Sequence, residues 1–319
     1  MAEHEIYFAT PEQMRRYKIR RILGQVILYT FLSVFALFIL FPFLYMIITS
    51  LKSETLYDFQ TAKKILDLMP QWTSTFRTNP DGSIAQTWYL FQNYQTVLGT
   101  TTNFFQYYLN TIIVAVLSTA FTVFTSVLAA FAFARLDFKG KNLLFTILLA
   151  TMMVPGEMMI ITNYQTALSW NWYNTYAALI LVHGVSIFYI FYLRQTFQQI
   201  PNELFLAAKV DGYGHFRYLW RVMIPIAMPS IVTIIILCLM GAWNAYVWPN
   251  MIASGNNPIF HNDMKLVSNG LMSLFTGEYS SEDTIKITAS MVITLPLLIF
   301  FFIFRKFIMS GVSRSGIKG

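Results

Sequence analysis

Six long apolar runs constrain this chain more than any other feature of its sequence. They lie at about 26–49, 109–134, 143–162, 176–193, 226–248 and 287–304. Each run is long enough to cross about 30 Å of hydrocarbon at about 1.5 Å per helical residue. Within lipid every backbone polar group needs a partner inside its own segment, so we expect these runs to be helices. The sequence therefore predicts an all-α membrane protein with six transmembrane helices.

The composition supports this class, because 56% of the residues are hydrophobic and only 12% are charged, against about 25% charged in soluble domains. No short apolar run with a small-residue cleavage site precedes the first long run, so we expect that run to be a retained span. The single cysteine, Cys238, excludes an intrachain disulfide. The net charge of +7 does not indicate nucleic-acid binding, since the basic residues are scattered between apolar runs.

The distribution of basic residues predicts the orientation, because loops on the cytoplasmic side carry an excess of Lys and Arg. With both termini inside, sixteen of the 22 basic residues fall on the inner side: Arg15, Arg16, Lys18, Arg20, Arg21, Arg135, Lys139, Lys141, Arg194, Lys209, Arg217, Arg221, Arg305, Lys306, Arg314 and Lys318. We therefore expect cytoplasmic segments at 1–25 and 308–319 and a six-helix membrane domain over 26–307. Two long outer loops then follow, at about 51–108 and 249–286.

The outer loops are either ordered and functional or disordered hydrophilic spacers. The first loop contains WTSTF and TWYLFQNY. Aromatic-rich segments of this kind prefer burial, and long ordered loops in a compact protein are often functional. We therefore favour ordered outer loops.

Several chemical signatures are missing from the sequence. Glu157 is the only acidic residue within the six runs, which argues against self-contained ion coupling, since such transporters place ionisable residues inside their spans. There is no GxxxxGK[ST] phosphate loop and no GxSxG motif, and the four histidines are scattered. We expect no catalytic residue, no metal site and no cofactor in this chain, so uphill transport would need the energy of a partner.

Four polar residues within or beside the apolar runs are candidates for a solute path. Glu157 follows Pro155-Gly156, a break of the kind that transporters use to expose backbone near a binding site; the alternative is a solvated residue at the outer rim. His183 and Ser186 lie near the middle of the fourth run, where they either face a path or form a helix–helix hydrogen bond. The same two alternatives apply to Asn244 in WNAYVWP, whose tryptophans indicate an outer interface.

A polar segment at about 195–224 separates the fourth and fifth runs. Pro201 suits a first helical turn, Glu203 suits a helix N-terminus, and ELFLAAKV supplies about two turns. Asp211-Gly212 supplies a stop, with glycine suited to the left-handed conformation. A second short helix, HFRYLWRVM, should end before Pro225. The sequence predicts a helix-turn-helix elbow on the cytoplasmic face, either an interfacial pair that caps the bundle or a docking element whose Ala207 and Ala208 leave a shallow surface.

The string IPNELFLAAKVDGYGHFRYLWRVMIP, at 200–225, resembles the EAA loop in the permease subunits of bacterial ABC importers. The matching positions are Ile200, Pro201, Glu203, Leu204, Ala207, Ala208, Asp211, Gly212, Phe216 and Pro225. FPFLYMIITSLKSE, FFQYYLNTIIVAV, WNAYVWP and the tail SGVSRSGIKG resemble other segments of the same family. The likeness covers nearly the whole chain and is strongest to the six-helix permease of maltose-type importers.

The resemblance implies a type I ABC importer permease in a bacterial inner membrane, with no enzymatic activity of its own. Its elbow would be a coupling helix that contacts an ATPase subunit through Glu203, Phe205, Leu206, Ala207, Ala208, Asp211, Gly212 and Tyr213. Leu206 and Tyr213 depart from the usual glutamate and alanine, which makes the elbow more apolar and bulkier. ATP and Mg would belong to the partner subunits.

The resemblance also implies partners and a solute class. The partners would be a second permease in a heterodimer, two cytoplasmic ATPase subunits, a solute-binding protein outside and membrane lipid. The outer segment SGNNPIFHNDMK would reach into the binding protein, and an insertion around RTNPDGSIAQTWYL is either extra docking surface or a passive elaboration. The solute would be a sugar or oligosaccharide, with glycerol-phosphate or a polyol as the alternative. A stand-alone carrier or channel and a membrane scaffold are the rival classes.

Overall fold

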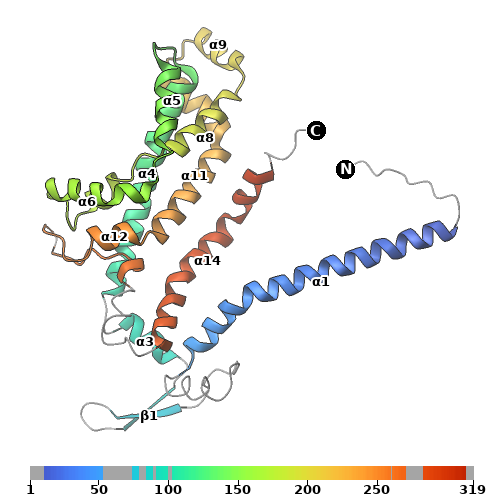
Figure 1. Ribbon diagram of the computed structural model, residues 1–319, viewed down its shortest axis with the longest axis vertical. Coiled ribbons are helices and arrows are strands. Elements are labelled where there is room, and N and C mark those ends of the chain that lie inside the picture. Colours follow the sequence, from blue (N-terminus) through green and yellow to red (C-terminus); the bar gives the residue numbers. More distant parts are fainter. Residues whose placement is uncertain are drawn as a thin grey trace. The chain divides into compact units, whose positions relative to one another are not determined.

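The computed structural model describes residues 11–52, 74–78, 84–88, 91–99, 103–259, 261–270 and 283–313. The first ten residues, most of the predicted loop at 51–108, Phe260, residues 271–282 of the predicted loop at 249–286 and the tail 314–319 lie outside this described part. The chain divides into two compact units, residues 1–93 and residues 94–319. Figure 1 shows the elements of each unit.

The first unit contains one long helix and a small hairpin. Helix α1, Pro11–Ser50, has 40 residues and includes the first predicted span. Strands β1, Ser74–Thr78, and β2, Ile84–Trp88, pair in antiparallel register. This hairpin overlaps the predicted insertion at 77–90, where the sequence had indicated no strands. The expectation of an all-α chain is therefore wrong for this loop.

The end of α1 is held by a side chain from the next helix. Asn93 is the second residue of helix α3, Gln92–Gly99. Its Nδ2 donates to the carbonyl of Ser50 at 3.0 Å and to that of Lys52 at 2.8 Å. These carbonyls would otherwise have no intrahelical partner, because the last carbonyls of a helix lack one. Asn93 therefore caps the C-terminus of α1.

The second unit consists, in its described part, of helices joined by loops, with one isolated β-bridge between Asn256 and Asp263. Its elements are α4 Phe104–Arg135, α5 Lys141–Thr151, η2 Gly156–Met159, α6 Ile160–Ser169, α7 Tyr176–Leu181, α8 Ile187–Gln198, α9 Asn202–Val210, α10 His215–Tyr218, η3 Leu219–Met223, α11 Ile224–Asn244, α12 Val247–Ile252 and α14 Asp283–Ser313. Helix α4 packs against α7, α8 and α11, and α14 packs on α11 (Figure 1).

Four helices among the described residues are long and apolar enough to cross a membrane: 14–50, 104–135, 215–244 and 283–305. The third predicted run is bent by 85° between α5 and α6, and adds a fifth crossing if the pair counts as one span. Pro155 and Gly156 lie at this bend, where proline has no N–H to continue the helix.

The fourth predicted run is not the single helix that the sequence indicated. It consists of α7 and α8 with an unwound segment at 182–186 between them. Gly184 lies in this segment against α4, where an added Cβ would be 2.2 Å from the Phe121 ring. Thr125 Oγ1 donates to the Gly184 carbonyl at 3.1 Å. Contact with α4 thus satisfies the backbone that the break leaves without an intrahelical partner.

The second helix of the polar segment also differs from the prediction, because it does not end before Pro225. It continues through a π-helical turn at Leu219–Met223 directly into α11. A wider turn ahead of a proline relieves the clash of the proline ring with the carbonyl of the preceding turn. The second helix of the polar segment and the fifth span therefore form one continuous helix.

Candidate functional site

Three of the four predicted path residues line one cavity. Glu157, His183 and Ser186 border a cavity of about 530 Å³ in the second unit. The fourth residue, Asn244, does not line it, and its Nδ2 donates to the Met240 carbonyl of its own helix at 2.9 Å. The structure therefore brings together residues from η2 and from the α7–α8 break.

The walls of the cavity come from α4, α8, α11 and α12. Helix α4 contributes the hydroxyls of Ser118, Thr119 and Thr122, and the other walls contribute the aromatic side chains Tyr189, Tyr246 and Trp248. Polar groups that point inward at membrane depth are costly unless they face a cavity or a partner. A wall of hydroxyls and aromatic rings suits a solute that carries many hydroxyl groups on an apolar carbon frame.

The break between α7 and α8 places His183 at the cavity. Its ring meets the Trp248 ring edge-on, with 5.2 Å between centroids and 68° between planes. Trp248 is held in turn, because its Nε1 donates to the Ala178 carbonyl at 3.1 Å. An unwound segment beside a cavity is how many transporters expose polar groups at mid-membrane depth.

The described residues contain no group of three or more His, Cys, Asp or Glu side chains that could hold a metal ion. The cavity offers hydrogen bonds, one carboxylate and aromatic faces. These groups can bind and orient a solute.

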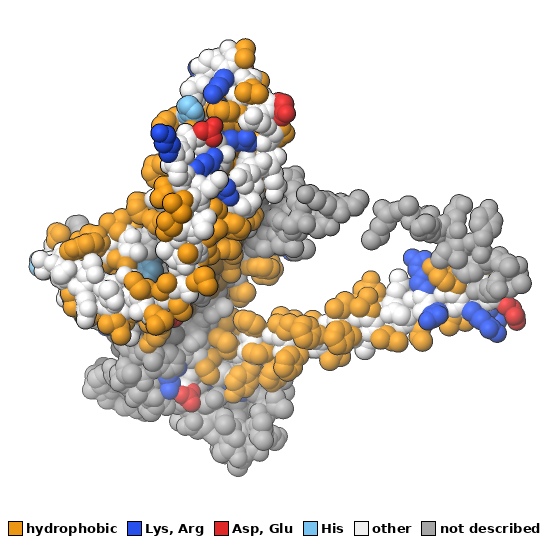
Figure 2. All heavy atoms as spheres, turned by 45° about the horizontal axis from the view of Figure 1, so that its top comes forward, with side chains coloured by type: hydrophobic (Ala, Val, Ile, Leu, Met, Phe, Trp, Pro, Cys, Tyr) orange, Lys and Arg blue, Asp and Glu red, His pale blue; other side chains and the backbone are white. Residues whose placement is uncertain are grey.

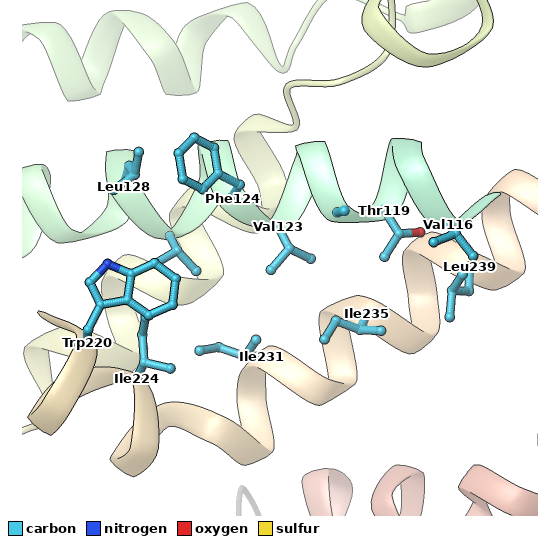
Figure 3. A pocket seen from close by; sticks show the side chains of 12 residues that line it. Val116, Thr119, Val123, Phe124, Leu128, Trp220, Ile224, Ile231, Ile235 and Leu239 are labelled. Carbon is cyan, nitrogen blue, oxygen red and sulfur yellow. The ribbon is translucent and has the colours of Figure 1, made fainter. Parts of the chain in front are cut away.

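A second hollow lies between α4 and α11 and has a different character. It has a volume of about 420 Å³ and is lined by Phe124, Val123, Trp220 and Ile231 among others (Figure 3). Among the described residues that line it, Thr119 alone bears a hydroxyl. An apolar hollow of this kind offers almost no hydrogen-bonding groups, so it is a poor site for a hydroxyl-rich solute.

The end of the bundle that carries α12 is tied together by Asn110 of α4, which is fully buried. Its Nδ2 donates to the carbonyls of Asp263, at 2.6 Å, and Lys265, at 3.0 Å. Its Oδ1 accepts from Tyr176 Oη at 2.7 Å and from Gln106 Nε2 at 2.8 Å. One side chain thus joins α4, α7 and the segment around 263–266, whose Leu266 lines the cavity.

Asn110 was not among the functional residues predicted from the sequence. The sequence feature that could have indicated it is an isolated Asn near the start of a predicted span, in YYLNTIIVAV. A buried amide side chain is nearly always hydrogen-bonded, so an Asn at this place predicts a partner. Neighbouring bonds support the same closure: Tyr107 Oη donates to Asp263 Oδ2 at 3.0 Å, and the Val267 amide donates to Thr111 Oγ1 at 2.9 Å.

At the opposite end of the second unit, α9 and α10 form the predicted helix-turn-helix. The turn has Gly212 at a φ of +75°, and the Tyr213 amide donates to the Ala208 carbonyl at 2.8 Å. Glycine is suited to this conformation because it has no Cβ. The stop that the sequence predicted at Asp211-Gly212 is confirmed, although α9 begins at Asn202, so that Pro201 precedes its first turn instead of lying in it.

One face of this elbow packs into the bundle. Ala208 is only 6% exposed and Phe205 meets Tyr218 with 5.0 Å between ring centroids. Both belong to a core shared with Leu193 and Phe197 of α8. The expectation that Ala208 leaves a shallow outer surface is therefore wrong. Ala208 follows Ala207 directly in the chain, and the turn of the helix between them places Ala208 on the inner face.

The other face of the elbow is exposed and partly apolar. Glu203, Ala207 and Asp211 are exposed, as are Leu206, Val210 and Phe216, the last two with 87% and 70% of their surface accessible. Val210 and Phe216 were not among the predicted contact residues. Exposed apolar side chains beside charged ones are typical of a protein docking surface.

Charged side chains of the second unit gather at this α9 end, above a largely hydrophobic surface (Figure 2). Among them, Arg135 at the end of α4 fixes the elbow. Its Nη2 donates to the Phe197 carbonyl at 2.9 Å and to the Ile200 carbonyl, and its Nη1 donates to Asn202 Oδ1 at 3.4 Å. The positive charge of Arg135 lies near the C-terminus of α8 and therefore also complements the dipole of that helix.

We expect Arg135→Ala to loosen the elbow, because two carbonyls lose a charged donor, each such bond being worth about 1.5–3 kcal/mol. Trypsin should cleave the purified variant after Lys209 or Arg217 at least several times faster than the parent. Arg135→Lys should be intermediate, since lysine keeps the charge but not the planar fork. Lys139→Ala, at an exposed position in the following loop, is the matched control, and equal cleavage of the two alanine variants would refute the role of Arg135.

A protein family described as "Binding-protein-dependent transport system inner membrane component" matches residues 123–314. The arabinooligosaccharides transport system permease protein AraQ of Bacillus subtilis is 29% identical over 72% of this chain and 79% of its own length. The lactose transport system permease protein LacG of Rhizobium radiobacter is 28% identical over 93% of this chain and 98% of its own length.

A solved structure is also similar in fold. It is a chain of a bacterial ABC transporter involved in the import of the acidic polysaccharide alginate, with a TM-score of 0.70 and 22% sequence identity. The likeness covers 94% of this chain and 99% of that chain.

Proposed function

The chain belongs to the family of binding-protein-dependent transport inner membrane components, and we propose that it forms one half of the path through which an ATP-driven importer moves a carbohydrate. It is a multi-pass protein of the bacterial inner membrane and a permease subunit of the carbohydrate type. The family is one of transporters and not of enzymes.

The observation that carries the energy-coupling part of this proposal is the elbow. It is a helix-turn-helix that packs against α4 and α8, continues into α11 and leaves apolar side chains exposed among charged ones. A packed helical element that continues into a span transmits force from a docked protein to the spans better than a flexible loop. We assign the docked protein as a cytoplasmic ATPase subunit, two copies of which hold the ATP and Mg.

The roles of the elbow residues divide by face. Glu203, Leu206, Ala207, Asp211 and Gly212 would contact the ATPase subunit, together with Val210 and Phe216. Phe205, Ala208 and Tyr213 would hold the shape of the elbow from its inner side, with the Arg217 guanidinium 4.5 Å from the Tyr213 ring centroid.

The proposed topology has six crossings with both termini inside. The bent pair α5–α6 and the broken pair α7–α8 would each count as one crossing. The charge bias of the sequence supports this orientation, and it places the elbow in the cytoplasm and the segment around Asn110 and Asp263 outside.

We place the solute at Glu157, His183 and Ser186. A second permease of different sequence would complete the path, and a solute-binding protein would deliver the solute to the outer loops. A sugar or oligosaccharide is favoured because the cavity offers hydroxyls and aromatic faces; glycerol-phosphate or a polyol is the alternative within the same machinery. A stand-alone carrier is the rival class, and the docking surface on the elbow argues against it.

Purification of the tagged chain from its native membranes in mild detergent, followed by mass spectrometry and an ATP hydrolysis assay, tests the proposal. We expect one further permease and two copies of an ATPase subunit, with ATP hydrolysis in the eluate. A chain that elutes alone or as a homo-oligomer, and still transports a sugar in vesicles without ATP, would establish the stand-alone carrier instead.

A further inference from the structure

The charges around the cavity are strongly one-sided. Among the described residues that line it, Glu157 is the only one with a formal charge at neutral pH, and none is lysine or arginine. None of the ion pairs found within the described part of the chain includes Glu157. Within the described part of the chain, no neighbouring cation neutralises the carboxylate in the cavity.

The position of Glu157 makes this charge effective. It follows Pro155 at the bend between α5 and α6, borders the cavity and is exposed instead of buried between helices. The remaining walls are hydroxyls, aromatic rings, aliphatic side chains and the thiol of Cys238. Low-dielectric walls weaken screening, so a single charge acts more strongly on a solute there than at an open surface.

Building on the proposed function, we propose that Glu157 sets the charge selectivity of the path, so that this half of the cavity admits neutral or amine-bearing carbohydrates and disfavours anionic ones. The carboxylate accepts hydrogen bonds from solute hydroxyls or from an ammonium group. It repels a phosphate or a uronate. This favours neutral sugars over the glycerol-phosphate alternative and over acidic polysaccharide fragments.

Charge-selective thiol labelling tests this without knowledge of the natural solute. In the complex as purified, Cys238→Ser removes the native thiol and Ser186→Cys places a reporter at the α7–α8 break of the same cavity. The rates of modification by cationic trimethylammonium-ethyl and anionic sulfonato-ethyl methanethiosulfonate are then measured. The ratio of cationic to anionic rates should fall by about fivefold when Glu157→Gln is added, since one carboxylate acts on both reagents with opposite sign.

Matched variants separate a local field from a general change of structure. Glu157→Asp should keep most of the ratio, and Glu157→Lys should lower it further than Glu157→Gln. A reporter at Ser169→Cys, at the far end of α6 and about 15 Å along the helix, should show the same ratio in all backgrounds, because that distance exceeds the Debye length.

An equal ratio with and without Glu157→Gln would overturn the proposal, as would a reporter at Ser186→Cys that neither reagent reaches. If Glu157→Gln does not fold, Glu157→Asp and the parent are compared at high salt instead. The ratio of cationic to anionic rates should then drop in both proteins toward the value of the Ser169→Cys reporter. A ratio that does not change with salt would contradict the role of the carboxylate. The labelling requires neither ATP nor a solute. A failure here is therefore distinguishable from a failure to find an ATPase partner.

Discussion

Gly212→Val should reduce ATP-driven uptake to less than about a tenth of the parent level while the protein still inserts into the membrane in normal amount. The native φ of +75° at this turn is one that a β-branched residue avoids, at a cost of at least about 1–2 kcal/mol. The turn would relieve the strain by changing its dihedral angles, which would displace α9 from α10 and misplace the docking surface. Uptake in whole cells and the amount of protein in isolated membranes are the two measurements.

The neighbouring glycine supplies a matched control. Gly214 has a φ of −72° and a ψ of 166°, an extended conformation that valine adopts readily, so Gly214→Val should retain most of the uptake. Gly212→Asn should also retain it, because asparagine tolerates the left-handed region. Normal uptake in Gly212→Val, or equal loss in both valine variants, would show that the shape of the turn is not what couples the chain to ATP.

Asn110→Leu should have the largest effect on stability. It leaves the Asp263 and Lys265 carbonyls and the Tyr176 hydroxyl without the partner that they have in the native protein. Buried polar groups without a partner cost about 1–3 kcal/mol each, so we expect a loss of roughly 3–5 kcal/mol. The apparent Tm of the purified protein in detergent should fall by about 5–10 °C.

Two further variants calibrate this result. Tyr176→Phe removes one of the bonds and should cost about 1 kcal/mol. Asn244→Leu replaces an asparagine that is exposed and bonds only within its own helix, so it should change the apparent Tm little. If Asn110→Leu and Asn244→Leu shifted the apparent Tm equally, Asn110 would not be what holds the segment around 263–266 to α4.

The elbow shows which features of the fold can be predicted from the sequence and which cannot. The positions of α9 and of the left-handed Gly212 follow from local rules, because helix stops and glycine turns depend on neighbouring residues. The face that each residue occupies does not, since Ala207 and Ala208 are adjacent in the chain but only Ala208 packs against α8. Which side of a short helix meets the bundle is decided by contacts with distant segments.

The solute path shows the same division. Glu157, His183 and Ser186 were selected one at a time as polar residues in apolar surroundings, and Asn244 was selected on the same grounds. The cavity that joins the first three and leaves out Asn244 depends on the bend after α5 and on the break between α7 and α8. Glycine at 184 was visible in the sequence, but its contact with Phe121 was not, because it joins residues from different helices.

The sequence by itself determined that the chain spans a membrane with helices, because apolar length and the need to satisfy backbone polar groups in lipid depend only on composition along the chain. It also determined where the polar elbow interrupts those spans. Only the tertiary structure decided where the fourth apolar run breaks, which polar residues share a cavity and which one, Asn110, ties together the end of the bundle that carries α12. These features arise from packing between helices, and no local pattern encodes which side chains of different helices meet.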